Sequence, residues 1–220
     1  MKKDQITKNF ATTSAPTVAD AIKVLKGAVK GKFDHTFECQ IALKLPVKNR
    51  KDAVRVSVIP PNSFSKPIKV VVLTDAQNAQ TAKDASADYV GLEDMVEKIM
   101  GGWSDFDIVI ATPSVMPQIA KLGKVLGPKG LMPNPRNETV TTDLKKSIES
   151  YKKGKLDYKM TESNQIAFKF GKFSMDDEKL IQNYEAFLDA LKSETAKYTG
   201  NVFSKIYIKT SMSPSIEIKA

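Results

Sequence analysis

Cysteine and histidine are nearly absent from this 220-residue chain, which has only Cys39 and His35. A single cysteine excludes an intrachain disulfide and fits a reducing compartment. One thiol and one imidazole cannot complete the ligand set of a zinc site, so we expect no bound metal. A Ser/His/Asp catalytic set would have to use His35 alone, which disfavours that class of enzyme. We also expect no cofactor.

Long apolar runs are missing as well. None approaches the roughly 20 residues that a membrane-spanning helix needs. The first ten residues carry charges but lack the apolar centre of a secretory signal. We therefore expect no membrane partner and a location in the cytoplasm, or in the matrix of an organelle. The apolar content of 41% is ordinary for a chain that buries a core, in one large or two modest domains.

Negative charge is scarce in particular regions. The net charge is +9, and residues 1–66 hold 13 lysines and arginines against 5 acids. Residues 67–157 are balanced at 12 of each, but their bases concentrate after residue 107, with 9 bases against 4 acids. Residues 158–220 hold 9 bases and 8 acids. Such segregation predicts a polyanionic partner, because solubility alone would not require it.

No acid lies between Lys121 and Arg136, where the sequence GKVLGPKGLMPNP fills Gly123–Pro135. Three prolines fix φ and three glycines permit positive φ, so this segment is predicted to be a shaped loop. Together with Lys124 and Lys129, its cationic character suits a surface that meets phosphate. An equally good interpretation from chemistry alone is a helix end followed by a turn.

Periodicity predicts the secondary structure around this loop. The three prolines between residues 60 and 67 mark a linker, and beyond it strands alternate with helices. The predicted helices are residues 14–30, 77–85, 92–100, 114–124, 142–152 and one that starts with a capping box at 174–177. The predicted strands are residues 33–45, 53–59, 68–74, 89–90, 106–111, 155–160, 165–170, 202–208 and 216–218, with 155–160 and 165–170 forming a hairpin.

This order predicts two domains of α/β and α+β class. A Rossmann-like parallel α/β domain, residues 67–157, would be inserted into a split α+β domain built from residues 1–66 and 158–220. The two chain passes near residues 66 and 158 would form a hinge.

The glycines of the loop do not form a nucleotide-binding fingerprint. Gly123, Gly127 and Gly130 follow a predicted helix and match neither G-x-G-x-x-G nor G-x-x-x-x-G-K-[ST]. We therefore expect that the chain is not an enzyme. The alternative is a phosphate-ligand-binding α/β domain or enzyme with a basic RNA-binding end, whose ligand would bind at the strand ends.

The segment GKVLGPKGLMPNP resembles the signature of the large-subunit ribosomal protein L-one family. ADYVG at Ala87–Gly91 and GGWSDFDIVIATP at Gly101–Pro113 are similar to further family segments, and the likeness is to the bacterial branch. The resemblance implies the same two-domain plan and a structural role on the mobile rRNA stalk at the tRNA exit side. It further implies contact with exit-site tRNA and release of deacylated tRNA, repression of the protein's own mRNA, and a monomer outside the ribosome.

The resemblance also implies a first RNA-binding segment. The family pattern K-F-D-x-T-x-E falls on Lys32, Phe33, Thr36 and Glu38. Lys32 would meet phosphate or a base edge, Phe33 would pack on a sugar or base, and Thr36 and Glu38 would bond 2′-hydroxyls or base edges. From the residues alone, the favoured interpretation of Phe33 is an ordinary core side chain, by about two to one.

A second implied segment is the turn T-[ST]-M-G-P-[GS], which falls on Ser211, Met212, Ser213 and Pro214. Ser213 stands where the family has glycine, so its Cβ would hinder close approach of RNA.

Further implied contacts are scattered along the chain. They are Arg55, Lys172 and, in the second domain, an RNA-facing loop with Lys121, Lys124, Lys129 and Arg136.

Overall fold

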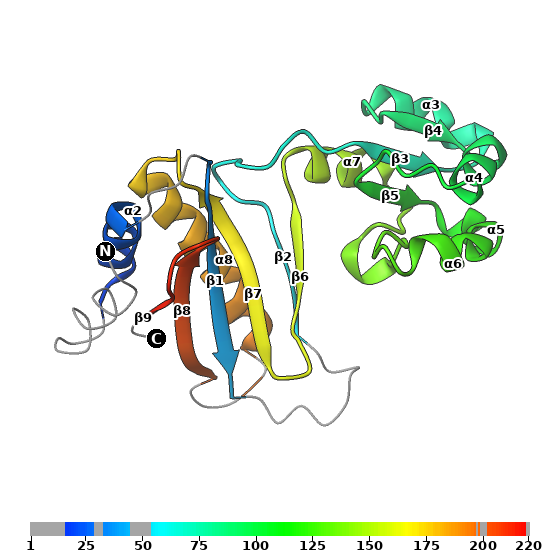
Figure 1. The fold of residues 1–220 in the computed structure, drawn as a ribbon. Coiled ribbons are helices and arrows are strands. Elements are labelled where there is room, and N and C mark those ends of the chain that lie inside the picture. Colours follow the sequence, from blue (N-terminus) through cyan, green and yellow to red (C-terminus); the bar gives the residue numbers. More distant parts are fainter. Residues whose placement is uncertain (1–15, 29–32, 45–53, 197, 199–201, 219–220) are drawn as a thin grey trace. The chain divides into compact units, whose positions relative to one another are not determined.

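The computed structural model describes residues 16–28, 33–44, 54–196, 198 and 202–218. Figure 1 shows the elements with the labels used below. The chain divides into two compact units, residues 1–64 with 156–220, and residues 65–155. The first unit holds antiparallel sheets and the second a parallel sheet, so the predicted mixture of α+β and α/β structure is confirmed.

A four-stranded antiparallel sheet organises the first unit. Its strand order is β7-β1-β8-β9, with β1 Thr36–Leu43, β7 Gln165–Lys172, β8 Phe203–Thr210 and β9 Ile216–Ile218. Alternate residues of β1 point into the core, namely Phe37, Cys39, Ile41 and Leu43. The residues between them form the opposite face, as the period-two alternation of the sequence predicts.

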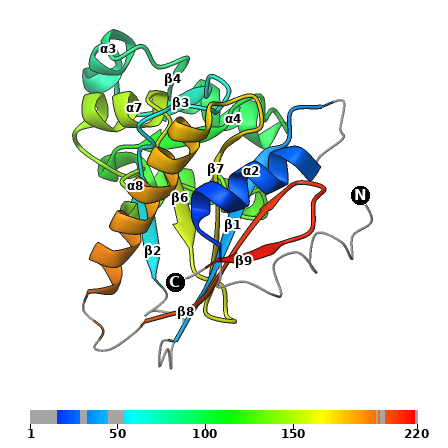
Figure 2. The same cartoon turned by 90° about the vertical axis from the view of Figure 1, so that its left-hand side faces the viewer.

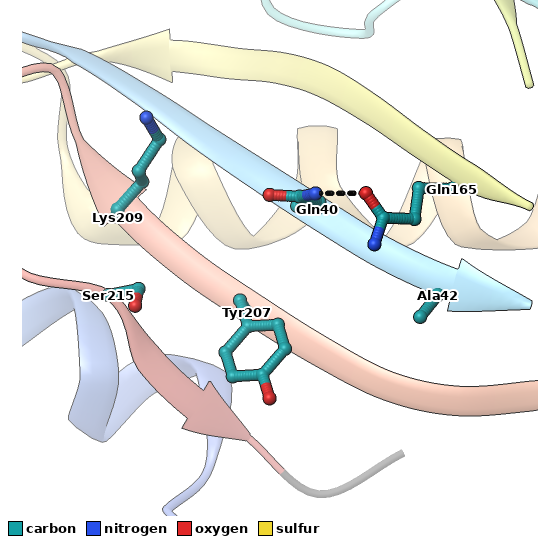
Figure 3. Close-up of a pocket in the computed structure, with 6 residues that line it drawn as sticks. All are labelled: Gln40, Ala42, Gln165, Tyr207, Lys209 and Ser215. Carbon is teal, nitrogen blue, oxygen red and sulfur yellow. Dashed lines mark hydrogen bonds between the residues drawn. The ribbon is translucent and has the colours of Figure 1, made fainter. Parts of the chain in front are cut away.

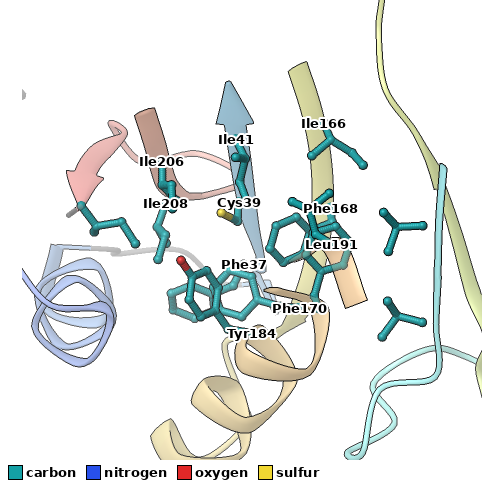
Figure 4. Close-up of a cluster of buried hydrophobic side chains, with 14 of the residues drawn as sticks. Phe37, Cys39, Ile41, Ile166, Phe168, Phe170, Tyr184, Leu191, Ile206 and Ile208 are labelled. Atoms are coloured by element: carbon teal, nitrogen blue, oxygen red, sulfur yellow. The ribbon is translucent and has the colours of Figure 1, made fainter. Parts of the chain in front are cut away.

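Two helices cover the core face of this sheet. They are α2 Val18–Ala28 and α8 Asp177–Thr195, and α2 packs against β8 and β9 (Figure 2). Aromatic side chains fill the space between β1, β7 and α8 (Figure 4). The predicted helix at 14–30 begins later, because Thr17 and Asp20 cap it reciprocally: each side chain accepts a hydrogen bond from the other's backbone nitrogen.

A second, two-stranded sheet corrects the predicted hairpin. The turn closes, since the backbone nitrogen of Thr161 donates to the carbonyl of Gln165 at 2.7 Å. However, β6 Leu156–Lys159 pairs with β2 Arg55–Val58, whereas β7 pairs with β1. The predicted pairing of the two strands is therefore wrong. A short turn brings the ends of two strands close together, but it does not decide which strand each one pairs with along its length.

The start of α8 also differs from the prediction. Asp176 is the N-cap but makes no side-chain cap bond, and it pairs with Lys179 at 2.8 Å instead. Ser174 bonds the carboxylate of Asp34. The predicted capping box is thus wrong, while Asp177 and Glu178 do occupy the first turn, where the helix dipole favours acids.

A three-stranded parallel sheet, in the order β4-β3-β5, organises the second unit. Its strands are β3 Val70–Leu73, β4 Tyr89–Gly91 and β5 Ile108–Ala111. All four residues of β3 are buried, as the continuous apolar run predicts. One face carries α3 Ala76–Asp84 and α7 Leu144–Lys152, and the other carries α4 Glu93–Met100 and a run of short helical turns.

That run replaces the predicted helix at 114–124. It consists of η2 Pro113–Val115, α5 Met116–Ile119, η3 Ala120–Leu122 and α6 Gly123–Leu126, followed at a distance by η4 Pro135–Asn137. Pro117 supplies no backbone donor, which interrupts regular α-helix. Buried apolar residues at helical spacing, from Val115 to Leu126, hold the turns on the sheet. The loop therefore starts at Gly127 and not at Gly123.

Candidate nucleic-acid interface

The two segments implied as RNA contacts meet at one end of the four-stranded sheet. Because β1 runs antiparallel to both neighbours, its start lies beside their ends. Thr36 pairs with Lys172 of β7, and Phe37 pairs with Thr210 of β8. The site so formed is called the strand-end cluster and consists of Phe33, Thr36, Glu38, Lys172 and Ser211–Pro214.

Hydrogen bonds tie the two segments directly together. The backbone nitrogen of Thr36 donates to the hydroxyl of Ser211 at 3.2 Å, and the backbone nitrogen of Ser211 donates to the carbonyl of Thr36 at 3.1 Å. These groups are 175 residues apart in the sequence. The cluster is therefore one surface with a fixed arrangement, and not two separate loops.

The turn after β8 presents Met212 to solvent. This side chain is 78% exposed, the highest value among the large apolar residues that the structure describes as exposed. Ser213, which replaces the family's glycine, closes the turn with its hydroxyl. That oxygen accepts from the nitrogen of Thr210 at 2.8 Å and donates to the carbonyl of Pro214 at 3.0 Å. The serine thus stabilises the turn that holds Met212 at its tip.

Phe33 lies on the surface and is not a core residue. It is 54% exposed, and its ring stacks on His35 with 3.9 Å between ring centroids. His35 is the buried member of the pair, at 2% exposure, and it also contacts Phe173. An exposed aromatic ring backed by a second ring is a stacking platform of the kind that binds unpaired bases.

Glu38 forms an ion pair at this surface. Its carboxylate pairs with the ammonium of Lys209 at 3.1 Å across β1 and β8. This ion pair offsets the negative charge that would otherwise repel a phosphate backbone. Lys209 can exchange the carboxylate for phosphate, which leaves Glu38 free to accept from a hydroxyl or amino group.

The implied contact Arg55 is not part of this cluster. Arg55 begins β2, next to Val54, whose carbonyl accepts from Met160. Leu43, at the far end of β1, bonds Asn164 in the adjoining turn. Arg55 therefore lies toward the Leu43 end of the unit, opposite Thr36. Lys32 lies outside the described residues.

Four cations of the second unit lie on the short helical turns η3, α6 and η4 and on the loop between α6 and η4, and we call this segment the basic loop. Lys121, Lys124, Lys129 and Arg136 are all exposed. Among the residues that the structure describes, none of the four takes part in an ion pair. Their charge is therefore available to an anionic partner.

Backbone bonds shape this loop, as its glycines and prolines predict. Gly127 lets the backbone pass close to the preceding turn, because a Cβ at this position would lie 2.5 Å from the carbonyl oxygen of Gly123. Gly130 adopts a φ of +70°, which favours glycine. Asn134 closes the far side through its backbone nitrogen, which donates to the hydroxyl of Thr139 at 2.7 Å.

The strand ends of the parallel sheet look different from a ligand site. Thr112 bonds Ser114, and Ser114 donates to the carboxylate of Asp75 at 2.6 Å. Polar groups that satisfy one another around a carboxylate disfavour a phosphate ligand. Within the described part of the chain, no group of three or more histidine, cysteine, aspartate or glutamate side chains could hold a metal ion.

Comparison with known proteins decides the family. The model of the protein family described as "Ribosomal protein L1p/L10e family" matches residues 24–214, which is most of the chain. The chain belongs to this family. The predicted family resemblance is thereby confirmed, and so is the expectation that the chain is not an enzyme.

Relatives of this L1-family chain are similar along nearly their whole length. The large ribosomal subunit protein uL1 of Borreliella afzelii is 40% identical over 204 residues, which cover 92% of this chain and 89% of that protein. That of Phytoplasma australiense is 41% identical over 202 residues, covering 90% and 87%. That of Persephonella marina is 39% identical over 207 residues, covering 93% and 86%.

Sequence reasoning missed Lys209, the partner of Glu38 in this L1-family chain. Both residues occupy the outward-facing positions of alternating strands, and that pattern was visible. Their pairing depends on the register between β1 and β8, which no local sequence pattern reveals.

Among the described helices, none combines the length and apolar character required to span a bilayer.

Proposed function

We propose that this chain is a structural protein of the large ribosomal subunit, and that its strand-end cluster binds the rRNA of the mobile stalk at the tRNA exit side. The observation that carries the proposal is the joining of Thr36 to Ser211 by hydrogen bonds at paired strand ends, with the exposed side chains of Phe33 and Met212 in the adjoining segments. Family membership supports the ribosomal part, since the relatives are named as large-subunit proteins.

The chemistry of the cluster suits folded RNA better than duplex DNA. Phe33 offers a ring face, Lys172 a cation for phosphate, and Ser211 a hydroxyl beside exposed backbone. RNA presents unstacked bases and 2′-hydroxyls to such groups. The cluster therefore recognises RNA through its shape and through contacts with its sugars. Contacts with phosphate add affinity that depends on the salt concentration.

The proposal also includes the domain roles. Residues 1–66 and 158–220 form the RNA-binding domain, and residues 67–157 form the inserted domain. The basic loop of the inserted domain meets the same RNA or a departing tRNA, which assists release of deacylated tRNA. The same strand-end cluster binds the protein's own mRNA and represses its translation. The protein acts on ribosomes, in the cytoplasm or in the matrix of an organelle, and is a monomer when free.

The deciding experiment is binding of the purified chain to a stalk-region rRNA fragment, compared with an unrelated hairpin of equal length, across a salt series. Tight and selective binding that survives moderate salt supports the proposal. Weak binding that is equal for both RNAs and is lost as the salt concentration rises means that only the net charge acts, and this result contradicts the proposal.

Two substitutions test the site itself. Met212→Asp and Phe33→Ala each remove an exposed apolar contact, so each should weaken stalk-RNA binding at least tenfold without lowering the thermal midpoint of unfolding. Met100→Asp is the matched control, because Met100 is also exposed, at 56%, but lies in the second unit. Unchanged binding in both cluster variants contradicts the site assignment.

A further inference from the structure

The face of the four-stranded sheet that points away from α2 and α8 holds a pocket. Its volume is about 240 Å³, and its lining residues are Gln40, Ala42, Gln165, Tyr207, Lys209 and Ser215 (Figure 3). Gln40 faces Ala167 on one neighbouring strand and Tyr207 on the other. Ala42 faces Gln165. The short side chain of Ala42 lies among longer side chains in the lining of this pocket.

The polar lining offers both donors and acceptors. The side-chain nitrogen of Gln40 donates to the oxygen of Gln165 at 2.7 Å, which orients the two amides relative to each other. The oxygen of Gln40 and the nitrogen of Gln165 are left on either side of this bond, as Figure 3 shows. A carboxamide pair arranged in this way can accept from and donate to the edge of a nucleobase.

Tyr207 supplies an aromatic ring at the same place. It lies directly opposite Gln40, between Ser215 and Ala42 in Figure 3, and it is only half-buried. A hydrogen bond with Tyr207 and the nearby carboxylate of Glu217 raise the pKa of Lys205. Lys205 therefore lies beside the hydroxyl of Tyr207, and Tyr207 itself lines the pocket.

The pocket adjoins the strand-end cluster without a break. Lys209 lines the pocket and pairs with Glu38 of the cluster, and Ser215 directly follows Pro214. An RNA bound at the cluster therefore passes over or beside the pocket. The volume lies below the roughly 300–1,000 Å³ of pockets that hold drug-sized ligands, which fits a single ring system.

We infer that this pocket receives one unpaired nucleobase of the RNA bound at the strand-end cluster, stacked on Tyr207 and read at its edge by Gln40 and Gln165. The inference rests on the proposed function. Lys209 binds the phosphate of that nucleotide after exchanging its contact with Glu38. A base within a duplex cannot enter, so the pocket selects RNA in which a base is unstacked at this position.

The first test is affinity of the full chain for the stalk-region rRNA fragment. Tyr207→Ala removes the stacking surface and should raise Kd about 5- to 100-fold. Tyr207→Phe keeps the ring and should bind within about threefold of wild type. Gln165→Ala should weaken binding severalfold, and because it is a surface change it gives a second reading if Tyr207→Ala lowers the thermal midpoint.

The second test identifies the base. Abasic substitutions are placed at each unpaired nucleotide of the fragment in turn. One position should weaken binding of the wild-type chain as much as Tyr207→Ala does, and should cause no further loss in the Tyr207→Ala chain. Such coupling requires that the missing base and the missing ring contact each other.

Two results overturn the inference, and they are distinguishable. If Tyr207→Ala binds like wild type and no abasic position couples to it, while Met212→Asp still weakens binding, the pocket is empty in the complex and the proposed function stands. If the wild-type chain binds the stalk fragment no better than an unrelated hairpin, the proposed function and the pocket both fail.

Discussion

Two polar side chains buried beneath the strand-end cluster have no hydrogen-bond partner among the residues that the structure describes. They are His35, through both ring nitrogens, and Thr210, through its hydroxyl. The exposures are 2% for His35 and 0% for Thr210. A buried polar group without a partner costs about 1–3 kcal/mol of stability. The cluster is therefore built on a locally unfavourable base, where His35 contributes the ring that supports Phe33.

Thr210→Val tests this cost at the scale of one residue. Valine keeps the shape of threonine and removes the unpartnered hydroxyl, so the free energy of unfolding should be unchanged or rise by up to about 1 kcal/mol. Thr195→Val is the matched control, because the buried hydroxyl of Thr195 donates to Leu191 at 2.8 Å, and its loss should cost about 1 kcal/mol. Urea unfolding measures both, and equal losses in the two variants would contradict the interpretation.

At the scale of elements, β7 passes close to the start of α8 at Gly171. A Cβ built there lies 2.2 Å from Cδ2 of Leu180 and 3.1 Å from the sulfur of Met175. Gly171 pairs with Phe37, next to an irregularity in the register of β1 and β7. The missing side chain thus lets the end of β7 pass under the start of α8 and brings Lys172 to the cluster.

Gly171→Ala should therefore lower the free energy of unfolding by about 1–3 kcal/mol through overpacking. It should also weaken RNA binding, because Lys172 and Thr36 are paired one residue away. Gly27→Ala provides the comparison, since Gly27 lies in α2 at a position where an added Cβ would point into open space. That change should stabilise by about 0.5–1 kcal/mol. A Gly171→Ala chain as stable as wild type would show that α8 shifts without cost.

At the scale of the whole molecule, charge is divided between a net-basic first unit and the basic loop of the second. The proposed function assigns both to RNA. Each phosphate contact contributes roughly 0.7–0.9 to the slope of log Kd against log salt concentration. The slope therefore reports how many cations engage, independently of which bases are read.

The double variant Lys124→Ala with Lys129→Ala should reduce that slope by about 1.5 and weaken binding to all RNAs alike. The control is Lys83→Ala with Lys98→Ala, which changes the net charge equally in exposed helix positions of the same unit. Salt titrations of stalk-RNA binding would compare them. Identical slopes for the two double variants would exclude the basic loop from the interface.

Local sequence patterns predicted most elements, because each depends on short-range periodicity. The apolar run at Val70–Leu73 gave a fully buried parallel strand, and Phe37, Cys39 and Ile41 gave the buried face of β1. Prediction failed where elements choose partners or break. The expected helix at 114–124 is a run of short turns with Pro117 in the first turn of α5, and the strand of residues 155–160 joined β2 instead of β7.

By itself, the sequence determined the fold class, the family and the buried face of the strands, because composition, motifs and alternation can be read from consecutive positions. Only the tertiary structure decided that Thr36 meets Ser211, that Glu38 pairs with Lys209 and that Gln40 lies opposite Tyr207. These contacts depend on the register of strands that are far apart in the chain. A period of two specifies the face of a strand but not its neighbour, so the surface that we propose binds RNA becomes visible only when the sheet is assembled.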